Sequence, residues 1–210
     1  MLEKLLSDRA QKLFRDLRPR YEEPHRSHHG VAHIVHCLRV FLTIEDIVAN
    51  KEAFELALIF HDATYDVGAK APLNEKNSAN LMMKASPHDR EVTQRAYLLI
   101  LATADHRIPP IEDESFTQDC ALFLDIDNSV LGSPRDEYQR YANNIRQEYL
   151  TVFSEEEFNR GRQAFLEGML DRESIFLSRH FRNRIESIAQ RNIRNELSHL
   201  QVPPSPRMTF

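Results

Sequence analysis

The chain has 210 residues, 41% of them hydrophobic and 28% charged, which are the proportions of an ordinary globular protein and exclude a disordered chain. Its formal net charge of −5 comes from 27 basic and 32 acidic residues mixed along the sequence, so we expect neither a nucleic-acid partner nor a membrane partner. We find no signal peptide, no apolar run long enough to cross a bilayer and no pair of neighbouring cysteines, so we expect a cytoplasmic protein.

Helices are expected throughout, because Leu, Ala, Glu, Arg and Gln recur while the chain has five glycines and no tryptophan. Apolar spacing and helix-breaking residues predict helices over residues 2–17, 30–50, 54–61, 75–85, 89–104, 117–126, 133–152, 154–170 and 181–200. No internal repeat or low-complexity linker divides the chain. We therefore expect an all-α protein with one compact helical domain over residues 1–200 and a frayed C-terminal tail over 201–210.

Local signals predict several helix ends. Pro19 should stop the first helix, which leaves residues 18–26 as an extended connection. Ser133 is expected to be the N-cap of a helix whose first residue is Pro134. The segment SEEE at 154–157 matches a capping box and predicts the start of the following helix.

Three histidines gather near the start of the expected second helix. His29, His33 and His36 lie at positions i, i+4 and i+7, and this spacing puts their rings on a shared face. Such a face occurs on packed or solvated helices as well as at metal sites. The spacing by itself leaves both interpretations open.

A second group of ligands follows an apolar run. The segment ALIF at 57–60 ends in His61 and Asp62, two side chains that bind metals well. Burying an aspartate beside such a run costs several kcal/mol unless the carboxylate is paired, and a cation would pair it. The alternative is that Asp62 caps the following loop while His61 packs in the core.

A third element places carboxylates inside an apolar stretch. The segment LFLDIDNSVLG at 122–132 contains Asp125 and Asp127, which cannot both take the same direction on a helix. One of them should point at the site, and the other should cap a helix or orient a ligand.

Together the three elements resemble the HD superfamily of metal-dependent phosphohydrolases, whose signature is a histidine, a distant His-Asp doublet and a more distant aspartate. The likeness extends to a bacterial subgroup of predicted HD phosphohydrolases. Its first motif, YxEPxRxYHxxxHI, is similar to YEEPHRSHHGVAHI at 21–34, where His28 replaces the usual tyrosine. Later motifs are similar to the segments HDATYD at 61–66, NEKNSA at 74–79, TADH at 103–106, LDID at 124–127 and IRQEY at 145–149.

The resemblance implies an HD-like helical bundle with additional C-terminal helices, and it implies four metal ligands: His33, His61, Asp62 and Asp127. His29 remains the rival of His33, with a role as a neighbour of the ligands or a substrate contact, and Asp125 remains the fallback for Asp127. Two imidazoles and two carboxylates favour a divalent transition metal, Mn, Fe, Ni or Zn, over Mg.

Further roles are expected around these ligands. The catalytic candidates, which could orient or deprotonate water or protonate the leaving group, are Asp66, Glu75 and His106. The substrate-binding candidates are Arg26, His29, Lys76 and Arg146. Three aromatic residues could flank a base or ribose: Tyr65, Tyr138 and Tyr141.

The expected activity is hydrolysis of a phosphoester in a small phosphorylated metabolite or nucleotide, with a metal ion activating water. One alternative is an HD-type di-iron oxygenase, in which His29, His36 and His106 would supply additional ligands. Another is a nucleotide-binding module that has the fold but no turnover. The sequence predicts no oligomeric state.

Overall fold

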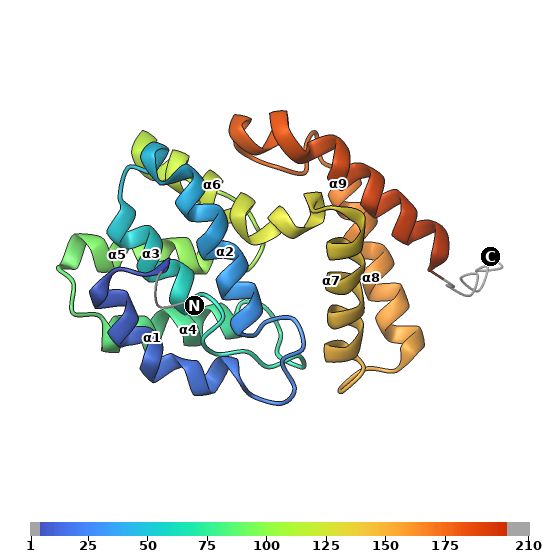
Figure 1. Cartoon of the computed structure of the whole chain (residues 1–210), viewed down its shortest axis with the longest axis horizontal. Helices are drawn as coiled ribbons and strands as arrows, with labels where there is room; N and C mark the ends of the chain where they lie inside the picture. Colours follow the sequence, from blue (N-terminus) through green and yellow to red (C-terminus); the bar gives the residue numbers. More distant parts are fainter. Residues whose placement is uncertain (1–4, 201–210) are drawn as a thin grey trace, which may run out of the picture.

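The computed structural model describes residues 5–200, and every regular element within them is a helix (Figure 1). The all-α prediction is therefore confirmed for the described residues. In chain order the elements are α1 (Asp8–Tyr21), α2 (Val31–Ile44), the 3-10 turn η2 (Glu45–Ile47), α3 (Lys51–Phe60), α4 (Leu73–Ala85), α5 (Arg90–Ala102), α6 (Glu114–Asp127), the 3-10 turn η3 (Asn128–Gly132), α7 (Arg135–Tyr149), α8 (Glu155–Leu170) and α9 (Arg179–His199).

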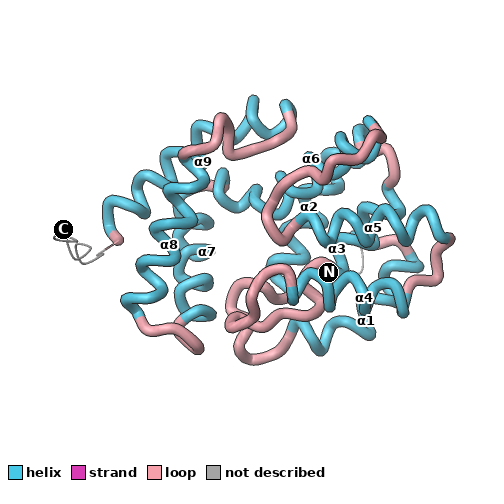
Figure 2. Tube along the Cα trace, turned by 180° about the vertical axis from the view of Figure 1, so that it is seen from behind, coloured by secondary structure: helices cyan, strands magenta, loops and turns pink. Residues whose placement is uncertain are grey.

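The helices form two groups joined by η3. Helices α1 to α6 pack around α3, which contacts α1, α2, α4, α5 and α6, whereas α7, α8 and α9 stand together beside them (Figure 1). The view from behind shows the same division, with loops gathered where the two groups face each other (Figure 2). Helix α9 packs against both η3 and α8, so the second group is tied to the first through the end of α6.

Helix α3 is central because it is apolar on nearly all sides. The run Leu56, Ala57, Leu58, Ile59 and Phe60 is buried, which is typical of a helix enclosed by others. Asn50 caps its N-terminus by accepting a hydrogen bond from the backbone N–H of Ala53 at 2.9 Å. His61 is the C-cap of this helix and Asp62 follows it, so the end of α3 places both residues in the middle of the fold.

Two contacts across the chain fix the second group of helices. The Asp125 carboxylate accepts backbone N–H bonds from Leu177 and Ser178, each 2.7 Å long, in the loop before α9. The Asn192 side-chain amide on α9 donates to the backbone carbonyls of Leu131 and Ser133 at 3.0 and 2.9 Å. These bonds hold α9 against the end of α6 and against η3.

Of the three helix-end predictions, one is confirmed and two were wrong. The capping box at the start of α8 is present, because Ser154 accepts from the Glu157 backbone N–H while the Glu157 carboxylate accepts from the Ser154 backbone N–H. The prediction that Pro19 ends the first helix was wrong, since α1 continues to Tyr21. The expected Ser133 cap was also wrong, since Pro134 occupies the N-cap position of α7 without a side-chain hydrogen bond.

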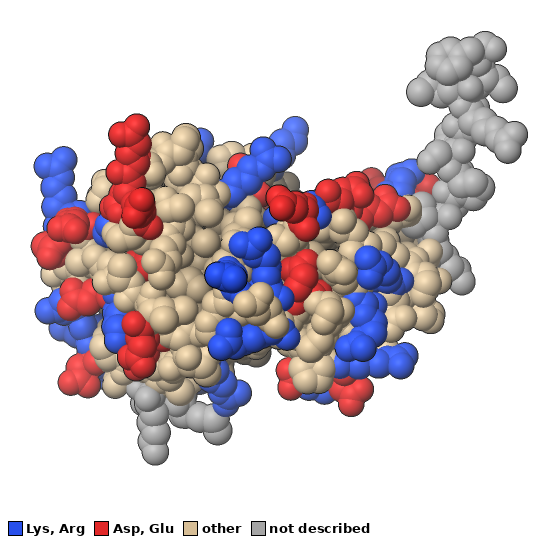
Figure 3. Space-filling model, turned by 90° about the horizontal axis from the view of Figure 1, so that it is seen from above, with Lys and Arg blue, Asp and Glu red and all other residues tan. Residues whose placement is uncertain are grey.

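Surface composition agrees with the mixed charge of the sequence. On the face seen in Figure 3, Lys and Arg side chains and Asp and Glu side chains both occur across the surface, in small groups of each sign. Within residues 5–200, no helix combines the length and the apolar character needed to cross a bilayer. The tail predicted to fray, residues 201–210, and the first residues of the expected first helix lie outside the described residues.

Candidate metal centre

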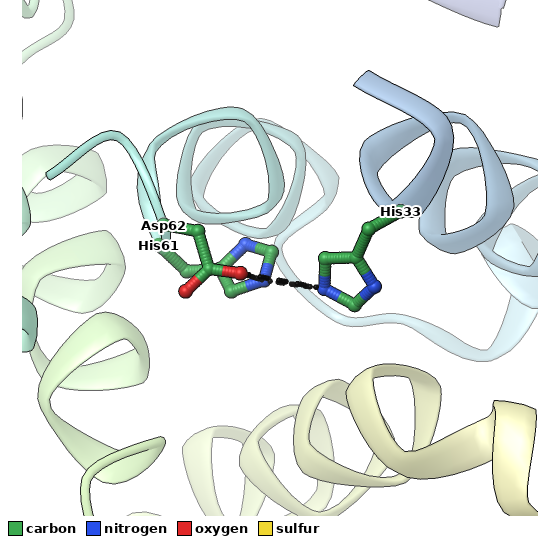
Figure 4. Close-up of side chains that lie close together, drawn as sticks. All are labelled: His33, His61 and Asp62. Atoms are coloured by element: carbon green, nitrogen blue, oxygen red, sulfur yellow. Dashed lines mark hydrogen bonds and ion pairs between the residues drawn. The ribbon is translucent and has the colours of Figure 1, made fainter. Parts of the chain in front are cut away.

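Four side chains from three helices converge at the centre of the molecule. His33 comes from α2, His61 and Asp62 follow the end of α3, and Asp127 is the last residue of α6. Figure 4 shows three of them, His33, His61 and Asp62, pointing toward one another. The His33 and His61 Nε2 atoms lie 3.0 Å apart, and the Asp62 Oδ2 atom lies 3.1 Å from Nε2 of His61 and 3.5 Å from Nε2 of His33. The Asp127 Oδ1 atom lies 3.1 Å from Nε2 of His33 and 3.6 Å from Nε2 of His61.

These spacings fit a shared cation. Nitrogen and oxygen ligands bind divalent transition metals at about 2.0–2.2 Å, so neighbouring ligands lie about 3.0 Å apart in an octahedron and about 3.4 Å apart in a tetrahedron. The five measured separations run from 3.0 to 3.6 Å. His33, His61 and Asp62 could therefore hold one ion, and Asp127 lies beside the same two imidazoles.

The ring of His61 is oriented for ligation. Its Nδ1 atom lies 3.0 Å from the carbonyl oxygen of Leu58, which can only accept, so Nδ1 carries the proton and donates it. When the ring is neutral, as a metal ligand must be, this leaves its Nε2 lone pair directed at the other three side chains. A hydrogen bond of this kind, which fixes the tautomer and the ring direction, is typical of metal-binding histidines.

His33 has a sulfur neighbour. The Cys37 Sγ atom, one helical turn further along α2, lies 3.7 Å from Nε2 and 3.8 Å from Nδ1 of His33. His33, Cys37 and Asp127 also place ligand atoms within 4.8 Å of one another. Cys37 belongs to no cysteine motif in the sequence, so a role beside His33 could not be predicted from the sequence.

The electrostatics of the site favour positive charge. Burial lowers the pKa of His33 and of His61, but neighbouring groups, Asp127 for both, overcome this effect and hold both pKa values well above the usual range. Burial raises the pKa of Asp62 and of Asp127, yet the imidazoles beside them keep both pKa values well below the usual range. Two nearly buried carboxylates are therefore ionised together, an arrangement that attracts protons or a cation.

The two carboxylate oxygens of Asp127 have different neighbours. Its Oδ1 atom lies beside the imidazoles of His33 and His61, whereas its Oδ2 atom lies 3.0 Å from the His106 Nε2 atom. His106 has a positive φ of 52°, in the left-handed region that non-glycine residues seldom adopt. The backbone is thus held in an uncommon conformation where it directs this ring at the site.

His29, the rival of His33, lies beside the cluster and has another partner. Its Nδ1 atom lies 2.5 Å from the Oε1 atom of Glu148, a fully buried carboxylate on α7. The other carboxylate oxygen, Oε2, accepts the backbone N–H groups of His28 and His29 at 2.9 and 3.1 Å. The His29 ring stacks on Tyr65 at 4.0 Å between centroids, so one carboxylate from α7 orients this whole segment.

The third histidine of the predicted face points elsewhere. The His36 Nε2 atom contacts the Ser129 hydroxyl at 2.7 Å, and that hydroxyl donates to the Ile126 carbonyl at 2.6 Å. Burial lowers the pKa of His36 to about 4. His36 therefore joins α2 to η3 as a neutral ring.

A cavity of about 530 Å³ opens over the cluster. Side chains from both groups of helices line it: His28, His29, Asp62, Tyr65, Glu75, Thr103, His106, Asp127, Asn128, Val130, Tyr141, Ile145, Tyr149, Phe153, Glu157, Phe158, Gly161, Arg162 and Phe165. The Oε2 atom of Glu75 is buried and has no hydrogen-bond partner among the described residues. A buried carboxylate oxygen without a partner is costly in a purely structural role, so it marks a place where a ligand or water is expected.

Other predicted site residues lie away from this cavity wall. Arg26 donates from its guanidinium to the Asp62 carbonyl at 2.5 Å and to the Ala63 carbonyl at 3.4 Å, so it braces the backbone of the doublet. Asp66 is exposed in the loop after the doublet, where its carboxylate accepts from the Gly68 N–H.

Lys76 is exposed on α4 and lines a separate shallow pocket with Pro72 and Asp105. Arg146 is paired with Glu155 at the surface. The structure brings neither basic side chain to the cavity. Asp125, the fallback ligand, points to the loop before α9 instead of to the cluster.

Two buried charged residues of this cavity region were not assigned by sequence reasoning, Glu148 and Arg162. Glu148 follows Tyr141 and Ile145 on the buried face of α7, and Arg162 lies on the buried face of α8. A charged residue at a core-facing helical position is the signal that could have found both.

Comparison of the chain with models of protein families, with curated protein sequences and with solved structures gives no match in any of the three.

Proposed function

We propose that this chain is a metal-dependent phosphohydrolase of the HD superfamily, acting on a phosphoester of a small phosphorylated metabolite or nucleotide. The observation that carries the proposal is the convergence of His33, His61, Asp62 and Asp127 at the base of the cavity. Their order along the chain, a histidine, a His-Asp doublet and a later aspartate, is the one that the resemblance implies.

A divalent transition metal suits the donors better than Mg²⁺ does. Two imidazole nitrogens and two carboxylate oxygens match Mn, Fe, Ni or Zn, whereas Mg²⁺ is held mainly by oxygen. Bound there, such an ion supplies Lewis-acid activation of water and of a phosphoryl oxygen.

The chain's own residues supply the proton transfers. The unpartnered Glu75 Oε2 atom is placed to accept a proton from a water molecule in the cavity. His106, held by Asp127, lines the same cavity and can donate a proton to the leaving oxygen. His29 presents the rest of its ring to the cavity while Glu148 holds Nδ1, so it suits contact with a substrate oxygen.

Phosphate release from a panel of nucleotides and sugar phosphates with added Mn²⁺ tests the activity. Asp62→Ala should abolish both metal retention and phosphate release. Glu75→Gln should keep the metal and lower kcat by ~10²–10⁴-fold, the range for loss of a general base. Glu156→Gln is the matched control, because Glu156 is an exposed glutamate on α8 paired with Arg160 and should leave kcat unchanged.

A second candidate, the di-iron oxygenase, is favoured by the position of Asp127 between the cluster and His106, since a bridging carboxylate could serve two ions. Metal analysis separates the two functions. Two irons per chain with an oxidation-dependent absorption band would support the oxygenase, and phosphate release with one Mn²⁺ per chain would support the hydrolase. If nucleotides bind tightly but no divalent ion gives turnover, the chain is a binding module.

A further inference from the structure

The cavity over the metal cluster has aromatic walls. Six phenylalanine and tyrosine side chains line it: Tyr65, Tyr141, Tyr149, Phe153, Phe158 and Phe165. Phe153 and Phe165 are 36% and 39% exposed, although large apolar side chains are otherwise mostly buried in this fold. Both come from α8 and the turn before it, so this part of the cavity wall is a partly open aromatic surface.

The same cavity has little free positive charge. Among the described residues that line it, Arg162 is the single Lys or Arg, and its Nε and Nη2 atoms already donate to the Glu196 carboxylate at 2.8 and 3.1 Å. Its Nη1 atom donates to the Tyr141 hydroxyl at 3.1 Å. The guanidinium is thus neutralised by Glu196, and the side chain is only 5% exposed.

Carboxylates in the cavity lining add negative charge to a cavity that already has little free positive charge. Besides the two ligand aspartates, Glu75 and Glu157 line the cavity, and the Glu157 pKa is lowered by hydrogen bonds from Ser154, which keep it ionised. Sites for di- and triphosphates gather Lys, Arg or backbone N–H groups around each additional phosphate. A second or third phosphate here would meet carboxylates and aromatic rings.

We infer that the α7–α8 side of the cavity is a subsite for a flat, uncharged aromatic ring system, so that the substrate carries one phosphoryl group on an aromatic body, as a nucleoside monophosphate does. The inference rests on the proposed function, because the metal cluster is the place for the single phosphoryl group. The volume of about 530 Å³ lies within the range of about 300–1,000 Å³ typical of pockets that enclose such molecules. A sugar phosphate without a ring system would leave the aromatic wall unfilled.

Three matched probes test the subsite. Adenosine monophosphate and ribose 5-phosphate carry the same phosphate on the same sugar and differ in the base, whereas adenosine triphosphate adds two phosphates to the first probe. Phosphate release is measured with Mn²⁺, and equilibrium binding is measured by calorimetry on the same preparations. We expect kcat/KM and affinity for adenosine monophosphate to exceed those for both other probes by at least about tenfold, which corresponds to ~1.4 kcal/mol.

Variants of the aromatic wall test whether it causes the preference for adenosine monophosphate. Phe165→Ala and Phe153→Ala change partly exposed side chains and should reduce the preference for adenosine monophosphate over ribose 5-phosphate by about tenfold, with ribose 5-phosphate itself unaffected. Leu42→Ala is the control, since Leu42 is similarly exposed, at 40%, on α2 outside the cavity lining.

The outcomes separate the two proposals. Equal rates and affinities for adenosine monophosphate and ribose 5-phosphate overturn the aromatic subsite while leaving the hydrolase proposal intact. A preference for the triphosphate overturns the single-phosphate assignment. Base-dependent binding that is lost in Phe165→Ala, without phosphate release from any probe, supports the subsite and overturns the hydrolase.

Discussion

Asp125→Ala and Asp127→Ala should separate folding stability from metal binding, although the two carboxylates lie two residues apart on α6. Asp125 is 2% exposed and accepts two backbone N–H bonds of 2.7 Å from the loop before α9. Asp127 instead joins the cluster, with Oδ1 at 3.1 Å from Nε2 of His33. The first variant should therefore loosen α9, and the second should remove a metal ligand.

The magnitude for Asp125 follows from two opposing effects. Hydrogen bonds to a charged group are worth ~1.5–3 kcal/mol each, so two of them stabilise the fold by ~3–6 kcal/mol. Burial raises the Asp125 pKa to about 6 even with these hydrogen bonds in place, so the buried charge is itself costly and the net contribution is smaller than this sum. We expect Asp125→Ala to lower the free energy of unfolding by about 1–3 kcal/mol.

The expected result for Asp127 is the reverse. The metal-free protein keeps the contacts to the loop before α9, which Asp127 does not make, so its free energy of unfolding retains that contribution, but metal affinity should fall by at least ~100-fold. Urea unfolding of metal-free protein gives the first quantity, and metal content per chain after dialysis against Mn²⁺ gives the second. If Asp125→Ala strips the metal as completely as Asp127→Ala does, the ligand assignment drawn from this geometry is wrong.

Three further variants test contacts around the site. Glu148→Gln should lower the free energy of unfolding by ~1–3 kcal/mol and lower kcat while metal content stays unchanged, because the buried carboxylate orients His29; an unchanged kcat would contradict this role. His36 has its pKa lowered to about 4 by burial, so its neutral form gives stability that is present above pH 6.5 and is lost as the pH falls toward 4. Between pH 7 and pH 5 the wild type should lose ~2 kcal/mol more than His36→Asn in urea unfolding, and equal losses would exclude this contribution. Gly132→Ala places a Cβ atom 2.6 Å from the Cβ atom of Ile185 and should lower the free energy of unfolding by ~1–3 kcal/mol, part of which Ile185→Ala in the same chain should restore.

The ligand-bearing helices could be predicted because their pattern is local. An apolar run that ends in His61-Asp62 predicts a buried helix with polar side chains at its end, and α3 has that form. The sequence did not show whether Asp125 or Asp127 faces the site. Residues two apart on a helix point about 200° apart, so the sequence says that they diverge without saying which one faces the site. That choice depends on where α9 lies, and the contact joins residues 52 and 53 positions apart.

Pro19 shows how tertiary contacts override a local rule. Proline inside a helix removes a hydrogen bond and crowds the preceding turn, which costs about 3 kcal/mol or more in a helix interior. Here α1 continues through Pro19 to Tyr21, whose hydroxyl donates to the Ile59 carbonyl at 2.9 Å and whose ring lies 5.8 Å from that of Phe14. These contacts hold the last turn of α1 in place, and they join segments that no local window contains.

The buried charged residues Glu148 on α7 and Arg162 on α8 depend on partners from distant parts of the chain. At Glu148 and Arg162 the helical pattern places an ionised group where an apolar one is expected, and such a group stays charged only if another part of the fold pairs with it. The partner of Glu148 is the segment at His28 and His29, about 120 residues earlier in the chain, and the partner of Arg162 is Glu196 on α9. The sequence can therefore mark these positions as unusual, but the identity of each partner follows from packing. Because one pairing orients a histidine beside the metal cluster and the other neutralises the guanidinium in the cavity wall, the C-terminal helices shape the chemistry of the site as well as enclosing it.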